Sequence, residues 1–259
     1  MRQTIKQTNT AAWLEVNWRH LLMAIIVVGS LLGILLLQPF GQNPNYHDFA
    51  DKRAFFGIPN FLDVASNLAF LIVGIAGLRI CPGNNTGNLR NAWIVLFAGV
   101  TLVSVGSAYY HLNPNNQTLV WDRLPMTIGF MGLFAALLGE YISERLGAFL
   151  LVPAILLGLS SVVYWHWFDD LRFYIWVQLI PLLTIPVIMI LYRAKYSHQW
   201  MLLAALGCYA LAKITELGDS QIFALSQDLI SGHTIKHLLS ALGCLFILLM
   251  LQKRKRLDS

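Results

Sequence analysis

Long apolar runs alternate with short polar connections along almost the whole chain. Eight of these runs come close to the roughly 20 residues that an α-helix needs to cross the hydrocarbon core of a bilayer. The predicted spans are Leu21–Leu37, Phe61–Ile80, Ala92–Tyr110, Arg123–Tyr141, Gly147–Tyr164, Phe173–Tyr192, Trp200–Leu217 and His233–Leu251. The pattern predicts an all-α protein, a polytopic transmembrane helix bundle. A transmembrane barrel would show short segments of alternating polarity instead.

The composition agrees with this class. Of the 259 residues, 57% are hydrophobic and only 12% are charged, whereas a soluble domain carries about 25% charged residues. The mean hydropathy is +0.61. Because the connections are short and none resembles a linker, residues 1–259 are predicted to form a single membrane domain.

Lysine and arginine are distributed unevenly between the two sets of connections. The positive-inside rule places the richer set in the cytoplasm, and eight spans then put both termini there. The cytoplasmic set has twelve members: Arg2, Lys6, Arg19, Arg79, Arg90, Arg145, Arg193, Lys195, Lys253, Arg254, Lys255 and Arg256. The opposite set has four: Lys52, Arg53, Arg123 and Arg172. The net charge of +5 is therefore a topology signal, and it does not predict a nucleic-acid partner.

Three histidines and one aspartate occur at the ends of predicted spans. His111 follows the third span, Asp122 directly precedes the fourth, and His233 and His237 lie in the first turns of the eighth. In the topology above, all four groups lie near the extracytoplasmic face. Ionisable groups inside a membrane are costly and usually mark function. We therefore expect one shared site near that face.

The spacing of the histidines favours a metal site. Residues at i and i+4 share one helix face, so His233 and His237 can present two nitrogens to one ion. His111 would supply a third ligand from another helix. Three protein ligands plus water are the catalytic form of a zinc site, although imidazole also suits iron, copper or nickel. Each histidine could instead be a hydrogen-bonded packing residue.

Three further polar residues have more than one interpretation. Ser107 precedes His111 by four residues, so its hydroxyl lies one turn deeper on the same face; it could also be a small residue at a helix contact. Asp122 could carry protons or cap the fourth span, and the two roles are compatible. Lys236 lies between the two histidines of the pair but off their face, where it would extend to the interface or pair with an acidic residue.

The polar motifs resemble the signature of the alkaline ceramidases. These belong to a superfamily of membrane hydrolases that includes adiponectin receptors and haemolysin-III-like proteins. The matching positions are Ser107 and His111 in S-x-x-x-H, then Asp122, then His233 and His237 in H-x-x-x-H. The segment 63–67, Asp-Val-Ala-Ser-Asn, also resembles the ceramidase branch, which carries a Ser-Asn pair there. The resemblance covers residues 60–251 and implies a seven-helix core, with residues 21–38 as an additional N-terminal span.

The resemblance also implies an activity and a set of site residues. His111, His233 and His237 would bind Zn²⁺, and Ser107 and Asp122 would assist at the metal as catalytic residues. The implied partner is a membrane lipid, a ceramide-like sphingolipid whose amide is cleaved to a sphingoid base and a fatty acid.

Two other functions stay open at this point. One is a receptor-like or haemolysin-III-like protein with a mainly structural zinc site. The other is a transporter or channel whose polar residues line a pathway. The transporter is less favoured, because the polar residues gather at one face and no paired broken helices mark inverted repeats.

The segment before the first core span leaves calcium open as a second cofactor. Eukaryotic alkaline ceramidases carry an acidic calcium-binding stretch here. Asp48 and Asp51 are oxygen ligands of the kind calcium prefers, but Lys52 and Arg53 place positive charge beside them. The stretch is either a retained calcium site or a salt-bridged lid over the metal site.

Overall fold

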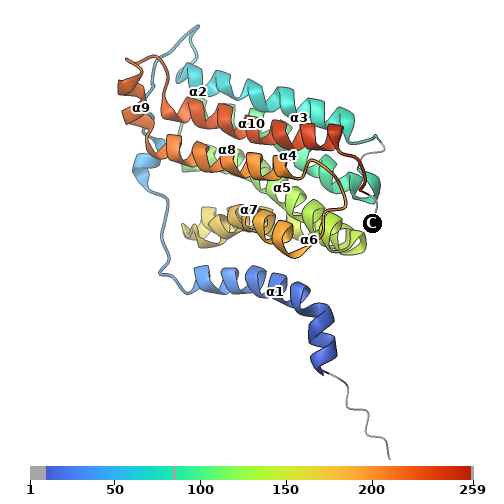
Figure 1. Ribbon diagram of the computed structural model, residues 1–259. Coiled ribbons are helices and arrows are strands. Elements are labelled where there is room, and N and C mark those ends of the chain that lie inside the picture. Colours follow the sequence, from blue (N-terminus) through green and yellow to red (C-terminus); the bar gives the residue numbers. More distant parts are fainter. Residues whose placement is uncertain (1–9, 84–85, 258–259) are drawn as a thin grey trace, which may run out of the picture.

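The computed structural model describes residues 10–83 and 86–257, and these form a bundle of helices (Figure 1). The helices are α1 (Thr10–Leu35), α2 (Phe61–Ser66), α3 (Leu68–Ile80), α4 (Arg90–Leu112), α5 (Asn116–Tyr141), α6 (Glu144–Phe168), α7 (Arg172–Leu191), α8 (Trp200–Leu217), α9 (Asp219–Leu225) and α10 (Gly232–Lys253), with short 3-10 turns at Pro44–His47 and Gly87–Leu89. Eight apolar segments of the described chain are long enough to cross a membrane. The predicted class, an integral multi-pass membrane protein, is confirmed.

The start of α5 differs from the predicted span. The helix begins at Asn116, and Asn115 is its N-cap, because the Asn115 side chain accepts hydrogen bonds from the backbone N–H groups of Gln117 and Thr118 at 2.9 and 3.0 Å. Asp122 therefore lies in the second turn of the helix. Its interpretation as an N-cap is wrong, and its carboxylate is free for another role.

The second predicted span is divided into α2 and α3 at Asn67. The side chains of Ser66 and Asn67 both donate to the backbone oxygen of Asp63, at 3.0 and 2.8 Å. Such local side-chain bonds compete with the backbone ladder, and the Asn67 backbone N–H bonds instead to Val64, at 3.3 Å. The short helix α2 lies beside α4 and α10, and it runs on into α3 (Figure 1).

Helix α5 is central and α1 is peripheral. Within its most apolar window, α5 is 78% buried and α1 is 6% buried. Figure 1 shows α1 at the edge of the bundle, beside α7. Several polar contacts attach it there. Trp176 Nε1 donates to Ser30 Oγ at 3.0 Å, and Arg172 Nη1 donates to the carbonyls of Leu35 and Leu37 at 2.7 and 2.6 Å.

Two glycine contacts bring α4 and α5 together. A Cβ added to Gly106 would lie 2.0 Å from the carbonyl oxygen of Trp121, and one added to Gly99 would lie 2.4 Å from the backbone nitrogen of Gly129. Only glycine allows backbones to approach so closely. Because Gly106 precedes Ser107 and Trp121 precedes Asp122, this contact also aligns the two predicted catalytic residues.

The two ends of the bundle differ in character. His111, Asp122, His233 and His237 gather where α4 ends and where α5 and α10 begin, and we call this the histidine end. The C-terminal end of α10 lies at the opposite end (Figure 1), where Arg254 and Glu140 form a buried ion pair. That opposite end also carries the basic residues at or next to the termini of α3, α4, α6, α7 and α10.

Candidate metal centre

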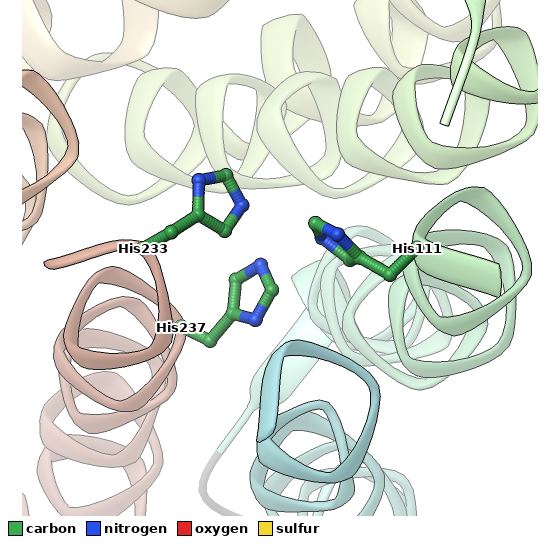
Figure 2. A group of neighbouring side chains, drawn as sticks. All are labelled: His111, His233 and His237. Atoms are coloured by element: carbon green, nitrogen blue, oxygen red, sulfur yellow. The ribbon is translucent and has the colours of Figure 1, made fainter. Parts of the chain in front are cut away.

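Three buried histidines meet at the histidine end. His111 comes from the last turn of α4, and His233 and His237 come from the first two turns of α10. One ring nitrogen from each can be chosen so that all three lie within 4.8 Å of one another, and the residues are 1%, 3% and 3% exposed. Figure 2 shows the three rings turned toward a common centre. The cluster could hold a metal ion.

The first turn of α10 is held by three separate contacts. The Ser231 side chain caps the helix by accepting the Thr234 N–H at 3.0 Å. An Asp219 carboxylate oxygen accepts the His233 N–H at 2.7 Å. Gly232 lies so close to α8 that an added Cβ would be 2.1 Å from the Thr215 oxygen. The two hydrogen bonds satisfy free N–H groups at the helix start, and together with the close packing of Gly232 they fix the direction of His233.

The orientation of His237 follows from a hydrogen-bond chain. The Ser66 hydroxyl donates its single proton to the Asp63 carbonyl at 3.0 Å, so it accepts a proton from His237 Nδ1 at 2.8 Å. A neutral imidazole protonated on Nδ1 keeps a free lone pair on Nε2. Ligand histidines typically have their other ring nitrogen held in this way. The arrangement therefore presents Nε2 of His237 as a ligand.

A buried nitrogen without a partner supports the same assignment. Among the described residues, Nδ1 of His111 is buried and has no hydrogen-bond partner. Burying an unpaired polar nitrogen is costly. Binding of the His111 ring to a metal ion would offset that cost. The His111 backbone is held in place because Asn60 Nδ2 donates to its carbonyl oxygen at 2.8 Å. Three neutral imidazoles are a donor set that fits zinc.

The structure brings Ser107 and Asp122 together beside the histidines. The two side chains lie close enough to interact, and they are only 2% and 8% exposed. Both line the same cavity as His237. All five residues predicted from the sequence thus lie at one place, although their chemical roles stay predictions.

An apolar cavity extends from this site into the bundle. Its volume is about 140 Å³, whereas a single water molecule needs about 10–15 Å³. Most of its polar residues gather at the histidine end: Ser107, Asp122, Lys236, His237 and Ser240. On α10 the lining runs from His237 to Ile247, a rise of about 15 Å at 1.5 Å per residue. A hydrocarbon chain suits these dimensions and this lining.

Residues 42–60, which we call the covering segment, close the site from the loop side. The ring of Phe49 is 4% exposed, and its centroid lies 4.4 Å from that of His233 and 4.7 Å from that of His111. The backbone N–H of Ala50 donates to Asp219 at 2.9 Å, and His47 contacts the Tyr110 hydroxyl at 2.8 Å. Phe49 thus shields the histidines from water.

The acidic residues of the covering segment are already paired. Asp48 binds Lys52, and Asp51 binds Arg53 through both carboxylate oxygens, at 2.8 and 2.7 Å. The sequence left two alternatives for this segment, a calcium site and a salt-bridged lid. The ion pairs are those expected of the salt-bridged lid. Within the described residues, the histidine cluster is the one group of three or more such side chains close enough to hold a metal ion.

The expected pairing of Lys236 is confirmed. Its ammonium group lies 2.6 Å from Glu216 Oε1 at the end of α8. Sequence reasoning missed three other contacts of the site. The Ser66–His237 bond could have been inferred from the Ser-Asn motif, but nothing in the sequence pattern marked Phe49 or Asp219 as neighbours of the histidines.

The fold and the site together define a class: a multi-pass membrane protein with a buried three-histidine centre at the end of an apolar cavity. Residues 57–257 match the ceramidase family. The chain belongs to the ceramidase family, as the motifs predicted, and membership implies an amidohydrolase. The matched region begins after α1. A comparison with curated proteins gives no match.

Proposed function

We propose that this protein is a zinc-dependent intramembrane hydrolase. It cleaves the amide bond of a ceramide-like sphingolipid and releases a sphingoid base and a fatty acid. The observation that carries the proposal is the position of the three histidines, Ser107 and Asp122 at the polar end of a deep apolar cavity. The family match supports the class of reaction.

His111, His233 and His237 would hold the metal ion. A zinc ion there would supply Lewis-acid chemistry, polarising a carbonyl oxygen and making water nucleophilic at neutral pH. Asp122 takes a proton from the attacking water and passes it to the leaving amine nitrogen. Ser107, which contacts Asp122 in the resting structure, donates a hydrogen bond to the developing oxyanion, and one such donor can contribute about 3 kcal/mol.

The cavity offers a place for the lipid beside the three histidines, Ser107 and Asp122. Its walls are apolar from the middle of α10 up to His237, so an acyl chain can lie inside while its amide remains at the polar end. Phe49 covers the side away from the cavity. Excluding bulk water strengthens every electrostatic interaction at the amide.

We further propose the orientation expected from the sequence. Both termini are cytoplasmic, and the histidine end faces the extracytoplasmic side. The basic residues at the opposite end support this, because such residues concentrate in cytoplasmic connections. The chain is then one membrane domain, in which a seven-helix core at 60–251 is preceded by an additional span at 21–38.

A receptor-like protein with a mainly structural zinc is the alternative within the superfamily. Such a protein requires no lipid-sized space beside its metal. The cavity that reaches Ser107, Asp122 and His237 favours the hydrolase.

The test is hydrolysis of a C16 ceramide by the purified protein. We expect activity in the zinc-loaded wild type, loss of activity after chelation with recovery on adding zinc, and loss in His233→Ala. His166→Ala is the matched control, since His166 is exposed on α6. Full activity in the metal-stripped protein or in His233→Ala would overturn the mechanism.

A further inference from the structure

Lys236 is a largely buried lysine to which the proposed mechanism gives no role. Its side chain is 16% exposed, and it lines the apolar cavity together with Ser107, Asp122 and His237. Placing an ammonium group in apolar surroundings is costly unless it is paired. A residue maintained there has either a structural partner or a function.

Glu216, the ion-pair partner of Lys236, also pairs with Lys213. Glu216 Oε1 lies 2.6 Å from the Lys236 ammonium, and Glu216 Oε2 lies 2.5 Å from that of Lys213. The hydroxyl of Tyr46 also donates to Glu216, at 3.2 Å. Two ammonium groups on one carboxylate leave one net positive charge among these three groups, and the Asp122 carboxylate is also close enough to interact with Lys236. Lys213 alone could neutralise Glu216, and it does so from an exposed position.

The ammonium of Lys236 is directed toward the metal ligands. Its Nζ lies 3.4 Å from Nε2 of His233, and Figure 2 shows the His233 ring turned toward the centre of the cluster. An ammonium group has three protons to donate, of which Glu216 takes one. Donors therefore remain for an acceptor at the polar end of the cavity, the place where the substrate carbonyl lies in the proposed function.

We propose that Lys236 is a further catalytic residue, which binds negatively charged oxygen on the acyl carbon of the substrate. It binds the oxyanion during attack and the fatty-acid carboxylate afterwards, and Glu216 positions it. This inference rests on the proposed function. In the reaction one C–O bond forms and the C–N bond breaks. Both protons of the water end on the amine nitrogen, so the products are a carboxylate and an ammonium ion.

Charge explains why a lysine suits this task. The carbonyl oxygen gains a full negative charge in the intermediate, and the carboxylate keeps it. A cation fixed in advance in a poorly hydrated site binds this charge more strongly than it binds the neutral amide. Lys236 therefore favours the intermediate and the acid product over the substrate.

The decisive experiment measures fatty-acid binding to metal-stripped protein, which needs neither hydrolysis nor zinc. Palmitate and hexadecanol share a chain and differ in charge. We expect Lys236→Met to weaken palmitate binding at least tenfold and to change hexadecanol binding less than twofold. Lys213→Met is the matched control, and it should leave both affinities within twofold. Lys236→Gln is measured in parallel, so that the test can still be made if Lys236→Met does not fold.

A kinetic measurement on the zinc-loaded protein separates a catalytic role from a structural one. Lys236→Met should lower kcat by about 10²–10³ with KM within threefold and zinc content unchanged, and Lys236→Arg should restore part of kcat. Equal palmitate affinity in wild type, Lys236→Met and Lys236→Gln would overturn the inference. Loss of zinc in parallel with activity would do so too.

The two proposals fail separately. If the wild type hydrolyses ceramide and the Lys236 variants bind palmitate as tightly as the wild type, only the proposed role of Lys236 is wrong. If no amide lipid is hydrolysed but palmitate binding depends on Lys236, the proposed function and the catalytic role of Lys236 are both wrong. Lys236 is then still part of an anion-binding site.

Discussion

Nδ1 of His237 donates a hydrogen bond to the Ser66 hydroxyl across the interface between α10 and α2, at 2.8 Å. The bond joins the Ser-Asn motif to the H-x-x-x-H motif, which lie 171 residues apart in sequence. It fixes which ring nitrogen of His237 can face an ion. The two motifs therefore form one structural unit.

Ser66→Ala should weaken metal binding. The His237 ring would lose the acceptor that orients it, and loss of such a contact typically costs 10- to 100-fold in metal affinity. The measurement is zinc affinity by competition with a chromophoric chelator. Ser104→Ala is the control, because Ser104 is also buried and donates to the Thr101 carbonyl in its own helix. Equal zinc affinity in the two variants would show that the Ser66 bond does not orient the ligand.

Asp122→Asn should abolish proton transfer while leaving the metal site intact. The amide keeps the size of the carboxylate and can still contact Ser107, but it cannot accept a proton. General acid–base groups typically contribute 10²- to 10⁴-fold, so ceramide hydrolysis should fall by that factor at unchanged zinc content. Asp63→Asn is a useful comparison. Asp63 is also buried at the histidine end, but it bonds to Thr234, at 2.6 Å, instead of lining the cavity. Its loss should reduce stability more than kcat.

Much of this site could be predicted because its signals are local. The i, i+4 spacing of His233 and His237 and of Ser107 and His111 sets their faces on any helix. The apolar runs gave the number of spans. Alternating span direction then predicted that the polar residues share one end, and the structure places them together.

The parts that were missed depend on contacts between distant segments. Phe49 lies in an irregular segment, where no periodicity indicates which side chain points inward. The sequence predicted an acidic partner for Lys236, but identifying that partner as Glu216 requires the packing of α8 against α10. The N-cap of α5 was different, because Asn115 and Thr118 carry a local capping signal. It was overlooked because the predicted span begins at Arg123, about two turns after the helix starts.

Gly106→Ala should destabilise the bundle at the site itself. The new methyl group would lie 2.0 Å from the Trp121 oxygen, so α4 and α5 must separate where Ser107 meets Asp122. Overpacking of this kind typically costs about 1–3 kcal/mol. We expect a lower midpoint of thermal unfolding in detergent together with reduced hydrolysis. Gly207→Ala is the control, since a Cβ there meets no atom of the described residues within 4 Å. An unchanged midpoint for Gly106→Ala would mean that the helices can separate at no cost.

The covering segment should lose stability in acid through Asp51. Burial raises the pKa of its carboxyl, but hydrogen bonds from the Arg53 side chain and backbone outweigh this and hold the pKa below its ordinary value. A carboxyl with a depressed pKa stabilises the fold above its unfolded pKa, about 3.9. That stability is lost as the pH falls through the lower folded value. The difference in unfolding midpoint between wild type and Asp51→Asn should therefore be constant from about pH 5 to 6 and shrink progressively below about pH 4. Asp48→Asn is the control, because its ion pair with Lys52 is exposed and such pairs stabilise little. A difference that grows as the pH falls would contradict the assignment of Arg53 as the partner that depresses the Asp51 pKa.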